Sequence, residues 1–547
     1  MSNFAKKLNE LRVTYSDSNF RVIVPIILFI LLCGSIAVYF SFWSKNEVDL
    51  RTLAPKDTII YLETKNLGET LNALTESKSF KGNSASKTDF SIINGIQIAI
   101  AVTGFETSKN QVTDEKAVLS FKPKFTAIAE THAWSWQVNS LVEINLDDFV
   151  KKIYGNNAKL EKKTVNNTER FTWTAEDGRK TFAVISDSQV FFGNDEESIN
   201  KCLLAKRGEA ESLLKNENLS LEYEKAKGKL AFGFISNEGI KQIADLVGVT
   251  VAVGQTDDEN SRGFISRILP QILTNTTREI TWTAEKTNKG IEDEIFIKTE
   301  NETSKVLSET LVSNTTNSNE ILQFIPPETS SVTRYNPKNP QIAFRSLLLT
   351  TAKNSDAVNA KIISAFSNSL LASYGVADAE GFLSAVDSEI ITVRLNDEER
   401  FAVVKVKDFE KLKQTIVEEI NFAKEPQAIG KNGKLWFADD KSLAVILIGD
   451  YFVIGDLESV SKSIENKNPI NFNLFTDFKN SKSVAVTLTK DLETTEKIVQ
   501  ILGKPRSNQI SQSYILTQTR FSKQGIERKY ISDYGFLGTI IEQFDNS

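Results

Sequence analysis

An internal duplication constrains the fold of this chain more than any other feature of its sequence. Short patterns recur in both halves in the same order: a strand running into an Asp-Phe helix start, a hairpin followed by Gly and a helix, and a Gly-Ile-Glu turn between two long strands. The matched positions are Asp148-Phe149 with Asp408-Phe409, Gly193 with Gly455, and Gly290 to Glu292 with Gly525 to Glu527. Chance rarely produces such an ordered series, so we predict two diverged copies of one domain.

Each copy has the pattern of an α+β domain. Strands in meanders with interspersed helices are typical of an antiparallel sheet whose helices pack mainly on one face. We expect the first copy over residues 53–298 and the second over 321–547. Residues 299–320 between them are polar, which is the composition of a linker.

A run of 22 residues without charge, Val22 to Trp43, precedes the first copy. As a helix it would be about 33 Å long, enough for a hydrocarbon core of about 30 Å. We therefore predict a single membrane span over 22–43, preceded by a short tail (1–21) and followed by a tether (44–52). The full fold prediction is an N-terminal transmembrane helix followed by two diverged repeats of an antiparallel sheet with helices mainly on one face.

Composition narrows the classes of partner and chemistry. The formal net charge is −6 and both signs are mixed along the chain, so we expect no nucleic-acid partner. Only two cysteines occur, Cys33 inside the predicted span and Cys202 on a predicted helix. A disulfide between them is not expected, and Cys202 is most simply a buried free thiol. A lipidated Cys33 is disfavoured because Leu32 before it is not small.

The sequence offers no recognisable catalytic, cofactor or metal constellation. His132 is the single histidine, so a His-based zinc site is not expected, and no G-x-S-x-G or phosphate-binding glycine motif occurs. The acidic pairs are interpreted as solvated loop carboxylates rather than catalytic or calcium-binding groups. These pairs are Asp147-Asp148, Asp257-Asp258 and Asp439-Asp440. We expect no catalytic residue, no cofactor and no metal.

Tryptophans leave two interpretations open. They either pack in the cores of apolar strands or line a groove that binds a ligand. The residues in question are Trp134, Trp136, Trp173, Trp282 and Trp436.

Several short motifs resemble an uncharacterised bacterial family of membrane-anchored proteins with a duplicated, exported α+β domain. The motifs are Leu53 to Thr58, Ile96 to Ala101, Gly525 to Arg528 and Tyr534 to Thr539. The resemblance implies the topology and transfers no functional residue. With the span, it predicts a single-pass protein of the bacterial inner membrane, its N-terminus cytoplasmic and the bulk of the chain periplasmic or extracellular.

The expected function is a non-enzymatic envelope protein whose duplicated domain is a binding or scaffold module. Its expected partners are the bilayer, through residues 22–43, and an envelope protein, glycan or lipid. Two alternatives stay open. One is a module that binds a lipid or another hydrophobic ligand. The other is a carboxylate-dependent glycan hydrolase, which needs two acids about 5 to 10 Å apart in one cleft.

Overall fold

The computed structural model describes residues 47–542 with internal gaps. The gaps are 77–89, 91–92, 114–115, 133–137, 139–149, 152–156, 166–167, 256–258, 315–318, 397, 431, 466–475, 480, 492–494, 496–497 and 499–512. The predicted tail and membrane span, residues 1–43, lie outside the described residues. Within the described part of the chain, no helix is both long and apolar enough to cross a membrane.

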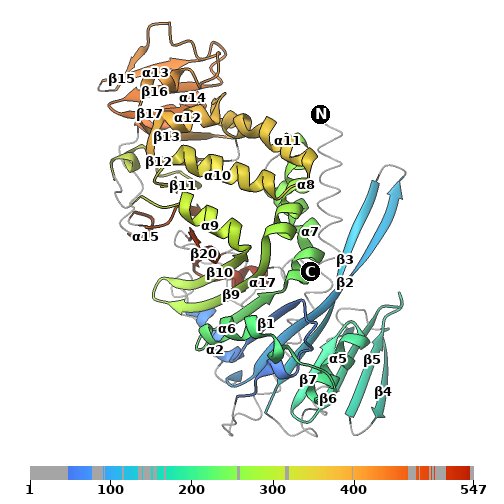
Figure 1. The fold of residues 1–547 in the computed structure, drawn as a ribbon. Helices are drawn as coiled ribbons and strands as arrows, with labels where there is room; N and C mark the ends of the chain where they lie inside the picture. The colour runs from blue at the N-terminus through green and yellow to red at the C-terminus, as the bar shows by residue number, and fades with distance from the viewer. Residues whose placement is uncertain are drawn as a thin grey trace.

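Ten strands of the first half form one antiparallel sheet. They are β1 (Ile60–Thr64), β2 (Gln97–Thr113), β3 (Lys116–Glu130), β4 (Lys159–Val165), β5 (Thr168–Thr174), β6 (Lys180–Ser186), β7 (Gln189–Gly193), β8 (Ala231–Ile235), β9 (Thr277–Thr287) and β10 (Gly290–Thr299). Their pairings give the spatial order β4-β5-β6-β7-β3-β2-β1-β8-β9-β10. The β2–β3 hairpin projects beyond the other strands (Figure 1).

Ten strands of the second half repeat this order. They are β11 (Ser331–Tyr335), β12 (Val386–Arg394), β13 (Arg400–Val406), β14 (Gln427–Ile429), β15 (Gly433–Phe437), β16 (Ala444–Ile448), β17 (Tyr451–Gly455), β18 (Ala485–Lys490), β19 (Tyr514–Ser522) and β20 (Gly525–Ser532). Their order is β14-β15-β16-β17-β13-β12-β11-β18-β19-β20, which matches the first half strand for strand.

The two halves join through their last strands. β10 pairs antiparallel with β20, from Ile291 opposite Ser532 to Lys298 opposite Gly525. All twenty described strands therefore form one sheet, with β10 and β20 at its middle (Figure 1). The predicted fold class is wrong on this point, because the halves share one sheet instead of forming two. Pairing removes two long unpaired strand edges, which are liable to aggregate when exposed.

Helices cover both faces of the sheet. The α-helices of the described chain are α2 (Leu67–Thr75), α5 (Glu196–Lys206), α6 (Glu217–Lys225), α7 (Asn237–Gln255), α8 (Glu259–Thr276), α9 (Asn301–Thr310), α10 (Pro340–Lys353), α11 (Ala357–Phe366), α12 (Ala379–Ala385), α13 (Phe409–Lys413), α14 (Leu457–Glu465), α15 (Thr476–Lys479) and α17 (Gly535–Glu542). Four 3-10 helices accompany them: η1 (Leu50–Thr52), η3 (Leu213–Lys215), η4 (Glu320–Phe324) and η5 (Ser367–Tyr374).

The burial pattern shows why both faces need cover. In the first half, α5 and α6 pack on the face that carries Tyr61, while Leu67 of α2 packs on the opposite face with Ile98. In the second half, α14 packs with Val332 and α12 packs on the other face with Ile390. Successive residues of a strand point to opposite faces, so strands with apolar residues at most positions bury both. The predicted packing of helices mainly on one face is wrong for this reason.

Side chains on the preceding turn define where the helices begin. Asp408 accepts a hydrogen bond from the backbone N–H of Lys411 and caps α13, as the sequence predicted. Asp195 caps α5 by accepting the backbone N–H of Ser198, and Asp456 caps α14 by accepting that of Ser459. Asn194 and Asp456, which follow the matched glycines, each accept an N–H from the facing strand. The donors are Phe125 to Asn194 at 3.1 Å and Arg400 to Asp456 at 2.9 Å.

The last helix of each half crosses to the other half. α9 follows β10 and packs on β19 and β20, whereas α17 follows β20 and packs on β9 and β10. The buried carboxylate of Asp293 on β10 secures the second crossing. It accepts hydrogen bonds from Trp282 Nε1 at 2.8 Å and from the backbone N–H of Phe536 in the first turn of α17 at 2.9 Å. α9 itself lies in the stretch 299–320 that was expected to be a linker.

Gly290, at the start of β10, lies very close to the backbone at the end of β20, and a substitution there tests how tightly the two strands pack. A Cβ at residue 290 would lie 2.2 Å from the carbonyl oxygen of Ser532, and the backbone φ of +127° is unfavourable for other residues. We expect Gly290→Ala to lower the free energy of unfolding by about 2–4 kcal/mol, through strain plus a steric clash. Denaturant titration of the full chain measures this.

Gly178→Ala is the matched control for that substitution. Gly178 also has positive φ, at +82°, but an added Cβ would meet no atom within 4 Å. It should lose only about 1 kcal/mol, the usual cost of the backbone conformation. Equal losses in the two variants would contradict the tight packing assigned to the junction.

Asp293 makes the stability of the junction depend on pH. Burial raises the pKa of Asp293 from 3.8 to about 6. Between these two pH values, the folded chain keeps a proton on Asp293 that the unfolded chain has released. This contribution to stability is present below pH 3.8 and is lost as pH rises through 6. Its size is about 3 kcal/mol at 1.36 kcal/mol per pKa unit.

Asp293→Asn should remove that dependence. The amide cannot ionise, so the stability difference between wild type and variant should shrink by up to about 3 kcal/mol as pH rises from 4 to 7. The variant also loses one of the two hydrogen bonds that Asp293 accepts, and this loss lowers its stability equally at every pH. Chemical denaturation at several pH values measures the difference, and two parallel stability profiles would refute the assignment.

Candidate functional site

An apolar pocket in the second half is the strongest candidate site. Its cavity volume is about 450 Å³, and it lies between α10, α12, η5 and the sheet. Ligand pockets in proteins commonly fall between 300 and 1,000 Å³. The lining comprises Leu311, Tyr335, Pro337, Pro340, Ala343, Phe344, Leu347, Leu371, Tyr374, Val376, Phe382, Leu383, Ile390, Thr392, Ala402, Val484, Ala485, Thr519 and Phe521.

Strand register assembles the floor of this pocket. Tyr335 on β11 lies opposite Ile390 on β12 and opposite Ala485 on β18, and Ala485 lies opposite Thr519 on β19. Residues that face each other in a ladder share one side of the sheet, so these side chains form a continuous surface. The small side chain of Ala485 leaves space at its centre.

Helix α10 forms a wall of the pocket. Pro340, Ala343, Phe344 and Leu347 recur at the three- and four-residue spacing that places side chains on one helical face. Asn339 begins this helix by accepting the backbone N–H of Ile342. α9 belongs to the end of the first half and contributes Leu311, just beyond its last turn.

The pocket is apolar with a few hydroxyl groups. Among the described residues that line it, none carries a charge, and the polar side chains are those of Tyr335, Tyr374, Thr392 and Thr519. Although 40% of Tyr335 is exposed, the protein atoms around its hydroxyl exclude water and raise its pKa. The protonated hydroxyl can donate a hydrogen bond. The pocket can therefore desolvate an apolar ligand and offer it a neutral hydrogen-bonding group.

The corresponding strand positions of the first half are buried. Ala231 and Ala284 pair on β8 and β9 as Ala485 and Thr519 pair on β18 and β19. Ala231 and Ala284 are 5% and 0% exposed and belong to a cluster packed against Trp282 and Leu537. By contrast, the matching Ala485 and Thr519 on the pocket floor are only half-buried.

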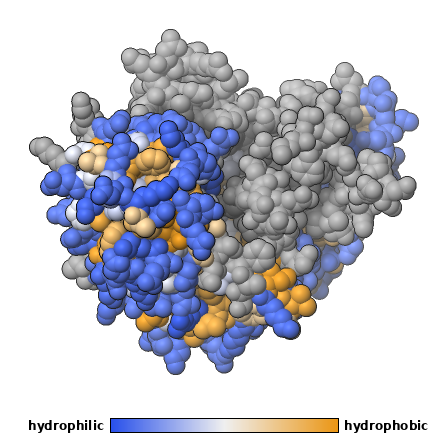
Figure 2. Space-filling model, turned by 90° about the horizontal axis from the view of Figure 1, so that it is seen from above, coloured by the Kyte–Doolittle hydropathy of each residue, from blue (hydrophilic) through white to orange (hydrophobic). Residues whose placement is uncertain are grey.

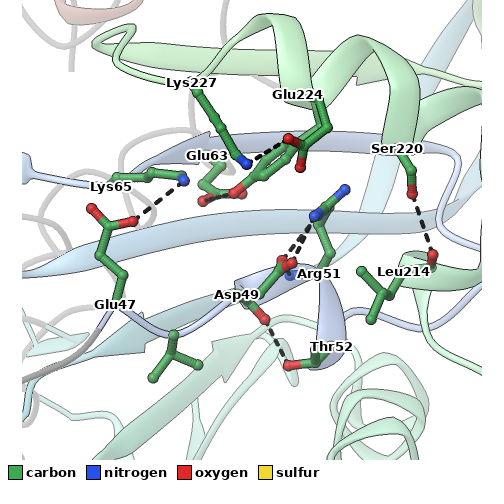
Figure 3. Close-up of polar contacts among 12 residues, drawn as sticks. Glu47, Asp49, Arg51, Thr52, Glu63, Lys65, Leu214, Ser220, Glu224 and Lys227 are labelled. Carbon is green, nitrogen blue, oxygen red and sulfur yellow. Dashed lines mark hydrogen bonds and ion pairs between the residues drawn. The ribbon is translucent and has the colours of Figure 1, made fainter.

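A buried polar cluster in the first half is the second candidate. Glu63 on β1 is 4% exposed and accepts hydrogen bonds at 2.7 Å from the hydroxyls of Tyr61 and Tyr223. The guanidinium of Arg51 lies 3.6 Å above the Tyr223 ring and pairs with Asp49 at 2.6 Å (Figure 3). Burial raises the pKa of Glu63, while the two tyrosine hydroxyls oppose the shift. Both carboxylate oxygens are engaged, so the cluster ties η1, β1 and α6 together.

The second half carries a buried charge at the matching position. Thr58 and Thr329 each donate a hydrogen bond to the carbonyl three residues earlier, and the charged residues Glu63 and Arg334 each follow five residues later. Arg334 forms an ion pair with Glu389 and donates to the carbonyl of Lys479 at 2.9 Å. The position thus keeps a buried charge while its sign and its partners differ.

The single histidine lies beside a buried carboxylate rather than in a catalytic arrangement. His132 Nδ1 lies 3.5 Å from Glu130 Oε1, which also accepts the backbone N–H of His132 at 2.8 Å. The other oxygen of Glu130 accepts a hydrogen bond from Gln189 Nε2. These contacts join the end of β3 to β7.

Cys202 is a buried free thiol, as the sequence predicted. It lies on α5 with 0% exposure, and burial raises its pKa to about 12. A thiol that does not ionise near neutral pH is a poor nucleophile and a poor metal ligand. Cys33 lies outside the described residues.

Two of the tryptophans are core residues. Trp173 is fully buried and stacks on Phe171 with ring centroids 5.9 Å apart, and Trp436 is 8% exposed. The core interpretation is confirmed for both. Trp282 lies where the two halves join and donates a hydrogen bond from its Nε1 to Asp293. Trp134 and Trp136 lie outside the described residues.

The acidic pairs do not form a described metal site. Asp439 pairs with Lys424 at 2.6 Å, and Asp440 accepts the backbone N–H of Ser442. Asp147, Asp148, Asp257 and Asp258 fall in gaps of the described chain. Within the described residues, no three His, Cys, Asp or Glu side chains gather around a possible metal position.

A module for a hydrophobic ligand was one alternative predicted from the sequence, but the residues of this pocket were not identified. The amphipathic stretch Ala357 to Tyr374, whose last part is η5 beside the pocket, equally predicts core packing. On the face seen from above, apolar side chains also lie exposed among hydrophilic ones, so exposure alone does not mark a site (Figure 2). Comparison of the chain with known protein families, with characterised proteins and with solved structures finds no match.

The Glu63 cluster yields a test of its structural role. Tyr223→Phe keeps the ring under Arg51 and removes one hydroxyl that donates to Glu63. We expect the free energy of unfolding to fall by about 1–3 kcal/mol, with a larger loss at pH 8 than at pH 5, because the missing donor mainly serves the ionised carboxylate. Tyr61→Phe removes the other donor and should behave alike. A loss independent of pH in both variants would contradict the cluster as described.

Proposed function

We propose that this protein binds a hydrophobic ligand, such as an acyl chain, in the pocket between α10, α12 and the second half of the sheet. The observation that carries the proposal is an apolar cavity of about 450 Å³ with hydroxyl groups on its wall. The pocket is open to solvent, with Tyr335 and Leu347 of its lining 40% and 41% exposed. A concave apolar surface of this kind is the usual form of a binding site for a hydrophobic ligand.

The difference between the halves supports the proposal. The halves share one strand order, yet Ala231 and Ala284 are 5% and 0% exposed, whereas the matching Ala485 and Thr519 are partly exposed and line the pocket. The strand order alone therefore does not produce this open apolar surface.

The other functions considered from the sequence receive less support. A glycan hydrolase needs two carboxyl groups in one cleft. The described lining of the apolar pocket contains none, and the hollow lined by Asp293, Asp491 and Asp533 has a volume of only about 50 Å³, which is too small for a sugar ring. A scaffold role in the cell envelope, with the bilayer as a partner, stays a prediction alongside ligand binding.

Filling the pocket should abolish ligand binding. Ala343 faces the cavity from α10, and Ala343→Trp would occupy much of the space next to the floor. We expect the affinity of the full chain for a neutral fluorescent probe, N-phenyl-1-naphthylamine, to fall at least about tenfold, the effect of 1.4 kcal/mol. Fluorescence titration measures the affinity, and a melting curve verifies folding.

Leu349→Trp is the matched control, because Leu349 is 64% exposed on the opposite side of the same helix. It should leave probe affinity unchanged. Wild-type protein that does not bind the probe, or an Ala343→Trp variant that folds and binds it normally, would refute the proposed function.

A further inference from the structure

The pocket has a polar side and an apolar side. Thr392 on β12 lies opposite Thr333 on β11, and Tyr335 is two residues further along β11, so the three side chains share one face. Tyr374 on η5 lies close enough to Tyr335 to affect its titration. The hydroxyl groups of Tyr335, Tyr374 and Thr392 therefore gather on the side formed by β11, β12 and η5, next to apolar lining residues such as Phe382 and Ile390.

The other side of the pocket is formed around β19 and α9. Phe521 and Val484 lie there, with Leu311 from α9 and Ala343 from α10, and these side chains belong to one apolar cluster. Thr519 is the single hydroxyl among the described lining residues of β19. A ligand with one polar end and one apolar end would bind in a single orientation, with its polar end toward β12.

The lining also restricts the charge of that polar end. An ionised carboxylate or phosphate loses its hydration on entering an apolar cavity, and the loss is large unless a cation or several donors replace the water. The described lining offers neutral hydroxyl groups and no Lys, Arg or His. Arg345, the nearby cation of α10, forms an ion pair with Glu380 of α12.

We propose that the ligand is an uncharged amphiphile, with an apolar chain and a hydroxyl or ester group that hydrogen-bonds to Tyr335 and its neighbouring hydroxyls. This inference rests on the proposed function. An apolar cavity of 150 Å³ holds one benzene molecule, so 450 Å³ accommodates a ligand of roughly twelve to eighteen carbon atoms.

Three twelve-carbon probes test the inference on the full chain. 1-Dodecanol, dodecane and dodecanoate share one chain and differ only in the end group, and each is titrated against bound N-phenyl-1-naphthylamine at pH 7.5. Dodecanol should bind at least about tenfold more tightly than dodecanoate, because the anion cannot be desolvated without a partner. Dodecanoate should gain affinity as pH falls and its carboxylate becomes protonated.

Tyr335→Phe separates the polar contact from chain burial. It should weaken dodecanol binding about fivefold, the effect of one neutral hydrogen bond, and leave dodecane binding unchanged. Tyr514→Phe removes a hydroxyl from β19 outside the pocket lining and should change neither affinity.

The outcomes distinguish the two proposals. If neither the fluorescent probe nor any twelve-carbon compound binds, the proposed function fails. If all three compounds bind equally, or dodecanoate binds best, ligand binding stands and the uncharged end group is refuted. Selective binding of dodecanol that weakens about fivefold in Tyr335→Phe supports both.

Discussion

The antiparallel pairing of β10 with β20 is the interaction on which the rest of the structure depends. It places eight residues of each strand opposite one another, from Ile291 with Ser532 to Lys298 with Gly525. Each half would otherwise end its sheet at an unpaired strand of eight to ten residues. The pairing converts two ten-stranded sheets of equal topology into one sheet.

This junction also determines how the pocket is completed. Because β10 runs beside β20, the helix that follows it, α9, reaches β19 and the second half instead of returning to its own. Leu311 at the end of α9 then becomes part of the pocket wall. The reciprocal helix α17 contributes Leu537 to the apolar cluster of the first half that contains Ala231 and Ala284. The exchanged helices thus take part in the pocket of one half and in a core cluster of the other.

Some of this arrangement could be predicted from particular residues. Asp408 marked the start of α13 because a carboxylate before a helix accepts its free amides, and Cys202 was placed in the core. The Gly-Ile-Glu pattern located the turns before β10 and β20. It did not reveal that these strands pair with each other, since alternating apolar and polar residues suit an edge strand and a central strand alike.

The pocket is harder to predict for a related reason. Its lining combines residues as far apart in the sequence as Leu311 and Phe521, and each local pattern is that of an ordinary core. The polar composition of 299–320 indicated a linker, although Leu307 and Leu311 within it bury against α10 and β19. A short helix with only two buried apolar side chains shows too little hydrophobic periodicity to be recognised in the sequence. Its stability comes from tertiary packing.

Amide hydrogen exchange across β10 and β20 tests the central claim most directly. If the two halves share one sheet, the amides of Ile295 and Phe296, opposite Arg528 and Glu527, should exchange as slowly as those of the central strands β1 and β11. The contrary result is protection of β1 and β11 together with rapid exchange of the β10 amides that point toward β20 and of the β20 amides that point toward β10. It would show two separate sheets and would contradict the account.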